Sequence, residues 1–459
     1  MQAADRRTLS LTSARGVNTL AGRLGADLPA FPMMSSHATL ELDLQTHTLG
    51  NGLRVILGRE ASLPLTAVNL WYHVGSKNER PGRTGFAHLF EHMLFQGSEH
   101  VGTNEHFRYI QQIGGVANGS TWYDRTNYYE TVPTHQLDLA LWLESDRMGF
   151  FLPALTQENL DTQRDVVMNE RRQRVENQPY GQAGERLHEL LYPEGHPYHW
   201  PVIGYMEDIA AANLEDVRTF FRTYYTPSNA VISVVGDIRQ EEALERVEAW
   251  FGDIPPGPPV PKVSPSLSPL GGERRLLIPD NVRLPRVYIG FRAPAYGDRL
   301  WYTADLLAAV LAGGKSSPLY RDLVYGRQIA QDVGASVGPY ECGGTFMLVA
   351  TARPGVTAGE LEEALLGHIA AAASAPPDPA DLERARNRML TDAYGSLQRL
   401  DTLADQLSQF ATYFGDPAGA LTEAERYLEI TPQELVDYAA GWCTEPERVV
   451  VSVVPRTAS

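Results

Sequence analysis

Cysteine is nearly absent from this chain of 459 residues. The two cysteines, Cys342 and Cys443, both lie in the C-terminal half and do not have the spacing of metal ligands. The sequence therefore indicates neither a framework of disulfide bonds nor a zinc site built from cysteines. We expect both residues to be buried thiols.

Long apolar runs are also missing. No stretch of about 18 or more apolar residues occurs, so the sequence predicts no membrane-spanning helix. Residues 1–36 scatter charged side chains among small and polar ones, without the apolar core of a signal peptide. We interpret this segment as a flexible tail and predict a cytoplasmic protein.

Positive charge is in deficit. The chain has 39 lysines and arginines against 56 aspartates and glutamates, which gives a net charge of −17 and a pI near 5.2. Nucleic acid and anionic membranes are therefore disfavoured as partners, because both attract cationic surfaces. The charge says little about the substrate.

A proline-rich segment divides the chain, which is too long for a single core. Residues 254–272 contain seven prolines among small polar residues, as in a semi-rigid linker. This linker separates a segment at 37–253 from one of similar size at 273–459. Near its end, each of these two segments has a similar apolar strand, at 230–236 in the first and at 448–454 in the second. We therefore predict an internal duplication.

The hydrophobic pattern predicts both strands and helices. In the first half, strands are expected at 40–44, 53–58, 65–74, 120–132 and 230–236, and helices at 104–112, 135–150, 156–175 and 214–225. Strands that pair with near neighbours, with helices gathered on one face, are typical of the α+β class. We therefore predict two homologous half-domains, each a mostly antiparallel sheet with helices on one face.

The most informative feature is the sequence His88-Leu89-Phe90-Glu91-His92. On a helix, residues three and four apart share a face, so the two histidines can chelate one ion while the glutamate faces the same pocket. The other positions of this helix are apolar, which is typical of a helix buried nearly all round. Unpaired polar groups cost several kcal/mol there. A metal site is therefore favoured over two surface histidines beside a solvated glutamate.

A catalytic zinc needs three protein ligands and an open position. The best third ligand is Glu170, which shares a helical stripe with Gln163 and Val167 on a core-facing side. The alternative is a glutamate paired with Arg171 or Arg174 on a solvated face. The histidine motif favours the ligand interpretation.

Three ligands and a neighbouring carboxylate predict amide hydrolysis. With His88, His92 and Glu170 holding one Zn²⁺, the metal lowers the pKa of bound water to about 7 and polarises a carbonyl oxygen. Glu91 takes the proton of this zinc-bound water and passes it to the leaving amine.

The order His-x-x-Glu-His resembles that of the inverzincins, the family of pitrilysin, insulin-degrading enzyme and mitochondrial processing peptidase. Further segments are similar to this family, at 85–93, 118–121, 126–129, 166–172 and 225–237. The resemblance is to the shorter two-domain bacterial type. It implies the mitochondrial-processing-peptidase-like metallohydrolase fold, a zinc-dependent endopeptidase whose half-domains enclose a chamber. A peptide or unfolded protein would be held there as an added strand.

By the same resemblance, Asn118 would hydrogen-bond the substrate backbone. The alternative is a turn asparagine before Gly119. Many members of the family carry a glutamate seven residues before the third ligand, and this chain has Gln163 there. Its amide can still accept a hydrogen bond from a ligand histidine, so the histidine's orientation is kept while charge donation weakens.

A second departure lies in the C-terminal half. Active single-chain relatives carry an arginine and, seven residues on, a tyrosine that stabilise the oxyanion, and here the positions hold Val324 and Gln331. Losing such donors costs about 10²-fold to 10³-fold each in turnover. We therefore expect the zinc-bearing subunit of a heterodimer whose homologous partner supplies the pair, with a homodimer as the fallback. The alternatives are a non-catalytic scaffold subunit of the same fold and a zinc hydrolase of small amides.

Overall fold

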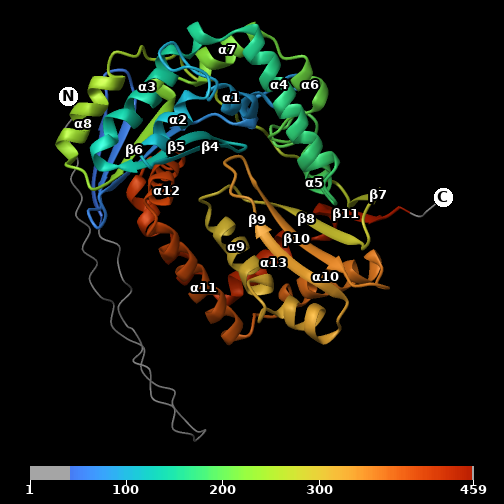
Figure 1. Ribbon diagram of the computed structural model, residues 1–459. Coiled ribbons are helices and arrows are strands. Elements are labelled where there is room, and N and C mark those ends of the chain that lie inside the picture. Colours follow the sequence, from blue (N-terminus) through green and yellow to red (C-terminus); the bar gives the residue numbers. More distant parts are fainter. Residues whose placement is uncertain (1–41, 457–459) are drawn as a thin grey trace, which may run out of the picture.

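The computed structural model describes residues 42–456, so the predicted tail at 1–36 lies outside the described residues. The described chain forms two sheets, each with its own helices (Figure 1). The first has six strands in the order β1-β2-β6-β3-β5-β4, and the second has five in the order β7-β11-β8-β10-β9. None of the described helices is both long and apolar enough to cross a membrane.

The first sheet contains β1 (Asp43–Thr48), β2 (Arg54–Arg59), β3 (Leu65–Tyr72), β4 (Val116–Thr121), β5 (Thr126–Pro133) and β6 (Ala230–Gly236). Its domain also contains α1 (Phe86–Met93), α2 (Glu105–Gln112), α3 (Leu137–Ala154), α4 (Gln157–Arg171), α5 (Ala183–Leu191), α6 (Met206–Ala210), α7 (Leu214–Tyr224) and α8 (Gln240–Phe251). The central strand β6 is buried along its whole length, which suits its run of alanine and β-branched residues.

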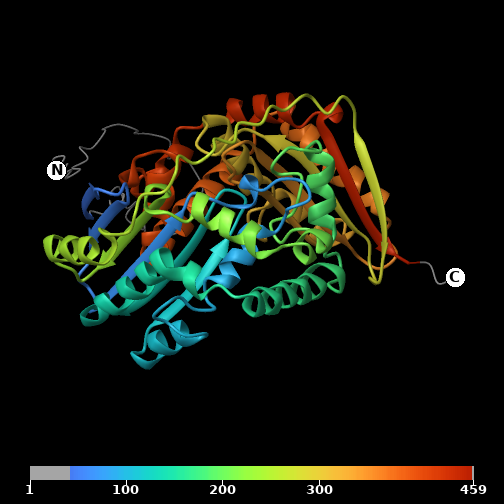
Figure 2. The same ribbon diagram turned by 90° about the horizontal axis from the view of Figure 1, so that it is seen from above.

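The second sheet contains β7 (Arg274–Asp280), β8 (Arg286–Ala293), β9 (Ala330–Val337), β10 (Gly344–Ala352) and β11 (Arg448–Pro455). Its helices are α9 (Arg299–Ala312), α10 (Ala358–Ala372), α11 (Pro379–Leu397), α12 (Leu400–Tyr413) and α13 (Pro432–Trp442). Residues 255–271 contain no helix or strand, and they run from α8 to β7 along the molecule (Figure 2).

The two sheets repeat one topology. Strands β2, β6, β3, β5 and β4 follow the same order as β7, β11, β8, β10 and β9. In each sheet one pair is parallel, β2 with β6 and β7 with β11, and every other pair is antiparallel. The predicted α+β class with mostly antiparallel sheets is therefore confirmed.

Each domain covers one face of its sheet with its own helices, and the other domain covers the second face. Helix α12 packs its buried Leu407 and Phe410 against the face of the first sheet that is opposite to that domain's own helices, around Trp71 and Val231. Helix α5 packs against β11 and β8 of the second sheet, and a side chain at Gly290 would come within 3.0 Å of Leu187. The two domains therefore share their cores through an exchange of helices (Figure 1).

Several expected boundaries differ from the structure. Of the strand expected at 40–44, residues 40 and 41 lie outside the described residues, and the first described strand is Asp43–Thr48. The strand group expected at 120–132 is the hairpin of β4 and β5. The helix expected at 156–175 is α-helical to Arg171 and continues as a π-helical turn, Arg172–Glu176, closed by the Asn177 amide donating to the Arg172 carbonyl.

Candidate metal centre

Helix α1 carries the histidine motif and begins without a side-chain cap of its own. Its first residue follows Gly85, which has a positive φ of 83° and comes so close to the Ile203 carbonyl that a Cβ would lie 2.6 Å from it. The carboxylate of Glu79 accepts hydrogen bonds from the amides of Gly85 and Ala87, each at 2.8 Å. These bonds satisfy amides that a helix start leaves free, so they hold α1 in place.

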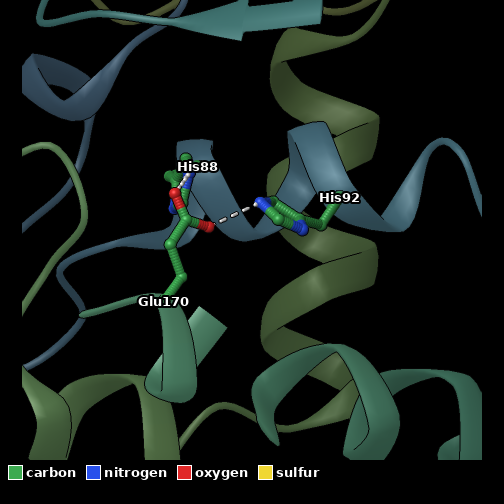
Figure 3. A group of neighbouring side chains, drawn as sticks. All are labelled: His88, His92 and Glu170. Atoms are coloured by element: carbon green, nitrogen blue, oxygen red, sulfur yellow. Dashed lines mark ion pairs between the residues drawn. The ribbon is translucent and has the colours of Figure 1, made fainter. Parts of the chain in front are cut away.

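The three predicted ligands meet where α1 faces α4. The Nε2 of His92 lies 3.2 Å from one carboxylate oxygen of Glu170, and the Nε2 of His88 lies 3.8 Å from the other. Glu170 reaches between the two histidines from below (Figure 3). One possible ligand atom from each residue falls within 4.8 Å of the other two, which is compact enough to hold one ion.

The charges of these groups suit a divalent metal. Burial, and to a smaller extent the neighbouring His92, together lower the pKa of His88 to about 4, so His88 is neutral near pH 7. The hydrogen bond from His92 lowers the pKa of Glu170, so its carboxylate is ionised. Imidazole nitrogens and a carboxylate are a donor set typical of catalytic zinc. The residues present therefore fit the metal.

Glu91 lies beside this cluster on α1 and is partly buried. Burial raises the pKa of Glu91, while a hydrogen bond from the Thr121 hydroxyl and the nearby His92 act in the opposite direction. A carboxylate with a raised pKa is a better proton acceptor near neutral pH.

Asn118 is an exposed residue of β4 rather than part of a turn. Its side-chain oxygen accepts a hydrogen bond from the Gly119 amide at 2.9 Å. Strand β4 is at the end of the first sheet and, within the described residues, pairs only with β5. Its other edge therefore offers backbone groups to an added strand.

Gln163 is buried on α4, two turns before Glu170 and on the same face. Over residues 42–456, the Nδ1 of His88 is buried without a hydrogen-bond partner, so Gln163 does not accept a bond from it.

Val324 and Gln331 occupy the positions at which active relatives carry an arginine and a tyrosine. Among the described residues, neither forms a hydrogen bond to the candidate metal centre. Val324 is part of the second domain's core, and Gln331 is exposed on β9.

The structure adds two groups that the sequence analysis did not single out as functional. The guanidinium of Arg174 lies 2.7 Å from Glu170. From the sequence, this ion pair was expected only as an alternative to metal binding by Glu170. The second group is Glu79, which caps α1. The residue before α1 is Gly85 and not serine, threonine or aspartate, so the sequence already indicated that the cap must come from another segment.

A second buried cluster has the donor types of a metal site but already holds a cation. His106, Glu130 and Glu144 bring their ligand atoms within 4.8 Å of one another. The guanidinium of Arg147 lies 2.8 Å from His106 and 3.4 Å from Glu144, and stacks on Tyr128 at 4.1 Å. A metal ion there would be repelled by Arg147 in a medium of low dielectric constant. We interpret this cluster as structural.

Comparison with known proteins identifies the family. A model described as insulinase, peptidase family M16, matches residues 54–198, and one described as the peptidase M16 inactive domain matches residues 211–389. The chain belongs to peptidase family M16. The insulinase match contains His88, His92 and Glu170, whereas the inactive-domain match begins after all three.

Named M16 relatives extend over nearly the whole chain. The zinc protease PqqE of Helicobacter pylori is 28% identical over 439 residues, which are 94% of this chain and 96% of that protein. The probable mitochondrial-processing peptidase subunit beta of Arabidopsis thaliana is 25% identical over 396 residues, 83% of this chain and 73% of that protein. The predicted resemblance to this family is therefore confirmed.

Solved structures of proteases share the fold. A protease from Helicobacter pylori superposes with a TM-score of 0.86 at 27% identity, over 90% of this chain and 100% of that one. The periplasmic protease PqqL from Escherichia coli superposes with a TM-score of 0.73 at 20% identity, over 92% of this chain and 49% of that one. Because that relative is called periplasmic, a cytoplasmic location for this M16 protein stays a prediction.

Proposed function

We propose that this chain is a zinc-dependent endopeptidase subunit. The observation that carries the proposal is the convergence of His88, His92 and Glu170 from two helices, with Glu91 beside them. The names of the relatives support the same function, because the Helicobacter pylori protein is called a zinc protease.

His88, His92 and Glu170 would hold the metal. When bound, zinc polarises the scissile carbonyl and makes water more acidic. Glu91 accepts a proton from the attacking water, whose oxygen forms the new bond to the carbonyl carbon. The same carboxyl then donates that proton to the leaving nitrogen as the C–N bond breaks.

The free edge of β4 would hold the substrate. A peptide pairing with backbone groups beside Asn118 forms an additional strand next to β4, at the side of the sheet that α1 contacts. Pairing through the main chain tolerates many sequences, so an extended peptide or unfolded protein is the substrate class. Small amides lack the backbone for this contact and are therefore the weaker alternative.

A partner chain would complete the active site. Val324 and Gln331 supply neither the arginine nor the tyrosine expected at these positions. This chain matches 49% of the length of the Escherichia coli protease PqqL, so that protein is about twice as long. We therefore propose a heterodimer with a homologous subunit that carries the pair, and a homodimer is the fallback assembly.

The test uses the purified full chain, alone and mixed with an M16 chain that lacks His-x-x-Glu-His but carries the arginine and tyrosine. Cleavage of an internally quenched peptide is measured before chelation, after chelation and after zinc is restored. We expect zinc-dependent cleavage in the mixture. Full activity of the isolated chain would reject the heterodimer, and zinc binding without cleavage in either sample would favour the scaffold function.

A further inference from the structure

Three arginines lie at the end of α4, next to Glu170, and they have different partners. Arg171 is buried and forms two hydrogen bonds to Glu185, at 2.7 and 3.0 Å. Arg172 is exposed and donates to the Asn169 side chain at 2.7 Å. Only Arg174, among these three, contacts a residue of the candidate metal centre.

The backbone that carries Arg174 is a π-helical turn, Arg172–Glu176. Such turns shift the side chains that follow by about 100° around the helix, and they occur frequently at functional sites. Gly181 packs against this turn so closely that a Cβ would lie 2.3 Å from the Val175 carbonyl and 3.0 Å from the Arg174 carbonyl. Only glycine fits there, so the close contact defines the path of the turn.

The loop that follows is attached to the second domain. The amide of Tyr180 donates to Asp280 at 3.1 Å, its hydroxyl donates to the Leu284 carbonyl at 2.9 Å, and its ring stacks under Arg286 at 3.9 Å. The position of Arg174 is therefore supported from both domains. An ordinary surface ion pair on a free helix end has no such support.

The two carboxylate oxygens of Glu170 have separate neighbours. Oε2 lies 3.2 Å from the Nε2 of His92. Oε1 lies 2.7 Å from a guanidinium nitrogen of Arg174 and 3.8 Å from the Nε2 of His88. A hydrogen bond to one oxygen of a ligating carboxylate leaves the other oxygen directed at the metal.

We propose that Arg174 is a positioning residue of the metal centre, holding Oε1 of Glu170 so that Oε2 alone serves as the ligand. The inference rests on the proposed zinc centre and adds a residue to it. Arg174 is 75% exposed, so water screens its repulsion of the metal strongly. The hydrogen bond from Arg174 to Oε1 of Glu170 acts at contact distance, so screening by water does not remove it. Orientation of the ligand therefore outweighs repulsion.

The first experiment measures zinc dissociation constants by chelator competition on the full chain. Arg174→Ala is expected to weaken zinc binding by about 10-fold to 100-fold. Arg174→Lys keeps one donor and should lose less. Arg172→Ala removes an equal charge two residues away and is the matched control, expected to stay within about twofold because exposed charges act weakly.

Cobalt substitution provides a readout of coordination itself. With Co²⁺ in place of zinc, the wild-type chain should give the intense visible absorption of four-coordinate cobalt. In Arg174→Ala the freed oxygen joins the metal, so the bands should weaken as the coordination number rises. Unchanged spectra together with unchanged zinc affinity would overturn the proposal.

A glycine substitution tests the same idea without removing a charge. Gly181→Ala should displace the π-helical turn and weaken zinc binding in the same direction as Arg174→Ala. Gly184→Ala is its control, because a Cβ there meets nothing within 4 Å. If the wild-type chain binds no zinc, the metal centre itself is rejected. If it binds zinc and both Arg174→Ala and Gly181→Ala match their controls, only the role of Arg174 is rejected.

Discussion

Helices α1 and α9 show how the two domains differ despite their shared strand order. Helix α9 contains no histidine, and its partly buried acid, Asp305, accepts a hydrogen bond from the Tyr427 hydroxyl at 2.8 Å. On α1, His88 and His92 instead face Glu170 from another helix. A polar group satisfied inside its own domain supports the fold, whereas converging imidazoles and a carboxylate form a site for a cation.

The exchanged helices form a second comparison. Helix α12 covers the first sheet with a largely apolar face, on which Asp405 accepts a hydrogen bond from the Trp71 indole at 2.7 Å, and it contains no histidine. Helix α5 covers the second sheet and carries His188, which is partly buried and stacks on Tyr123. The Nδ1 of His188 lies at hydrogen-bond distance, 3.1 Å, from the Tyr123 hydroxyl. The two contacts are equivalent in topology, and only the one made by α5 contains a histidine of the exchanged helix.

The largest expected effect tests the difference between α1 and α9. Glu91→Gln removes the proton acceptor and should lower peptide hydrolysis by about 10²-fold to 10⁴-fold, with zinc content unchanged. Asp305→Asn alters a partly buried carboxyl group on the corresponding helix and should leave hydrolysis intact. Initial rates and metal analysis on both variants provide the measurement. Equal cleavage by wild type and Glu91→Gln would refute Glu91 as the base.

The next effect concerns the exchange of helices. Leu407→Ala on α12 and Leu187→Ala on α5 each leave a cavity against the other domain's sheet, and each should lower the free energy of unfolding by about 2–5 kcal/mol. Because each contact joins the two domains, denaturant unfolding should remain one transition for both variants. Two separate transitions, with only one of them shifted, would show that the domains unfold independently.

A smaller effect distinguishes α5 from α12 by pH. Burial lowers the pKa of His188 from 6.5 to about 4. Between these values the unfolded chain binds more protons than the folded chain, so the free energy of unfolding falls as the pH drops through this range. Since each pKa unit corresponds to about 1.4 kcal/mol, His188 contributes roughly 3 kcal/mol to the fall.

Replacing this histidine isolates its share of the pH dependence. His188→Phe keeps a ring beside Tyr123 and should unfold with a shallower pH dependence below pH 6.5 than the wild type, measured by denaturant titration of the metal-free chain. His188→Phe should also cost about 1 kcal/mol at neutral pH, because the hydroxyl of Tyr123 loses its partner. Parallel pH curves for both proteins would contradict the assignment.

The smallest expected effect concerns Gln163. The Nδ1 of His88 is buried without a partner, and a carboxylate two turns before Glu170 would attract its N–H. Gln163→Glu should therefore tighten zinc binding by roughly tenfold. Gln157→Glu, on the exposed first turn of α4, is the control. An unchanged or weaker affinity in chelator competition would reject this role for residue 163.

Much of the fold was predictable because its signals are local. The apolar run of β6 and the polar stripe of α1 are periodic patterns that identify a buried strand and a ligand-bearing helix. The end of α4 was not predictable in this way. Arg172–Glu176 continues the helical sequence pattern, and the change to a π-helical turn is associated with the close approach of Gly181.

The sequence by itself determined the α+β class and the likeness of the two halves, and it identified His88, Glu91, His92 and Glu170 as the candidate centre. These followed from residue type and helical spacing, which act over a few residues. Only the tertiary structure decided that α5 and α12 are exchanged, that Glu79 caps α1 and that Arg174 pairs with the candidate ligand Glu170. Such pairings depend on how separate helices and sheets pack, and no local pattern records that packing.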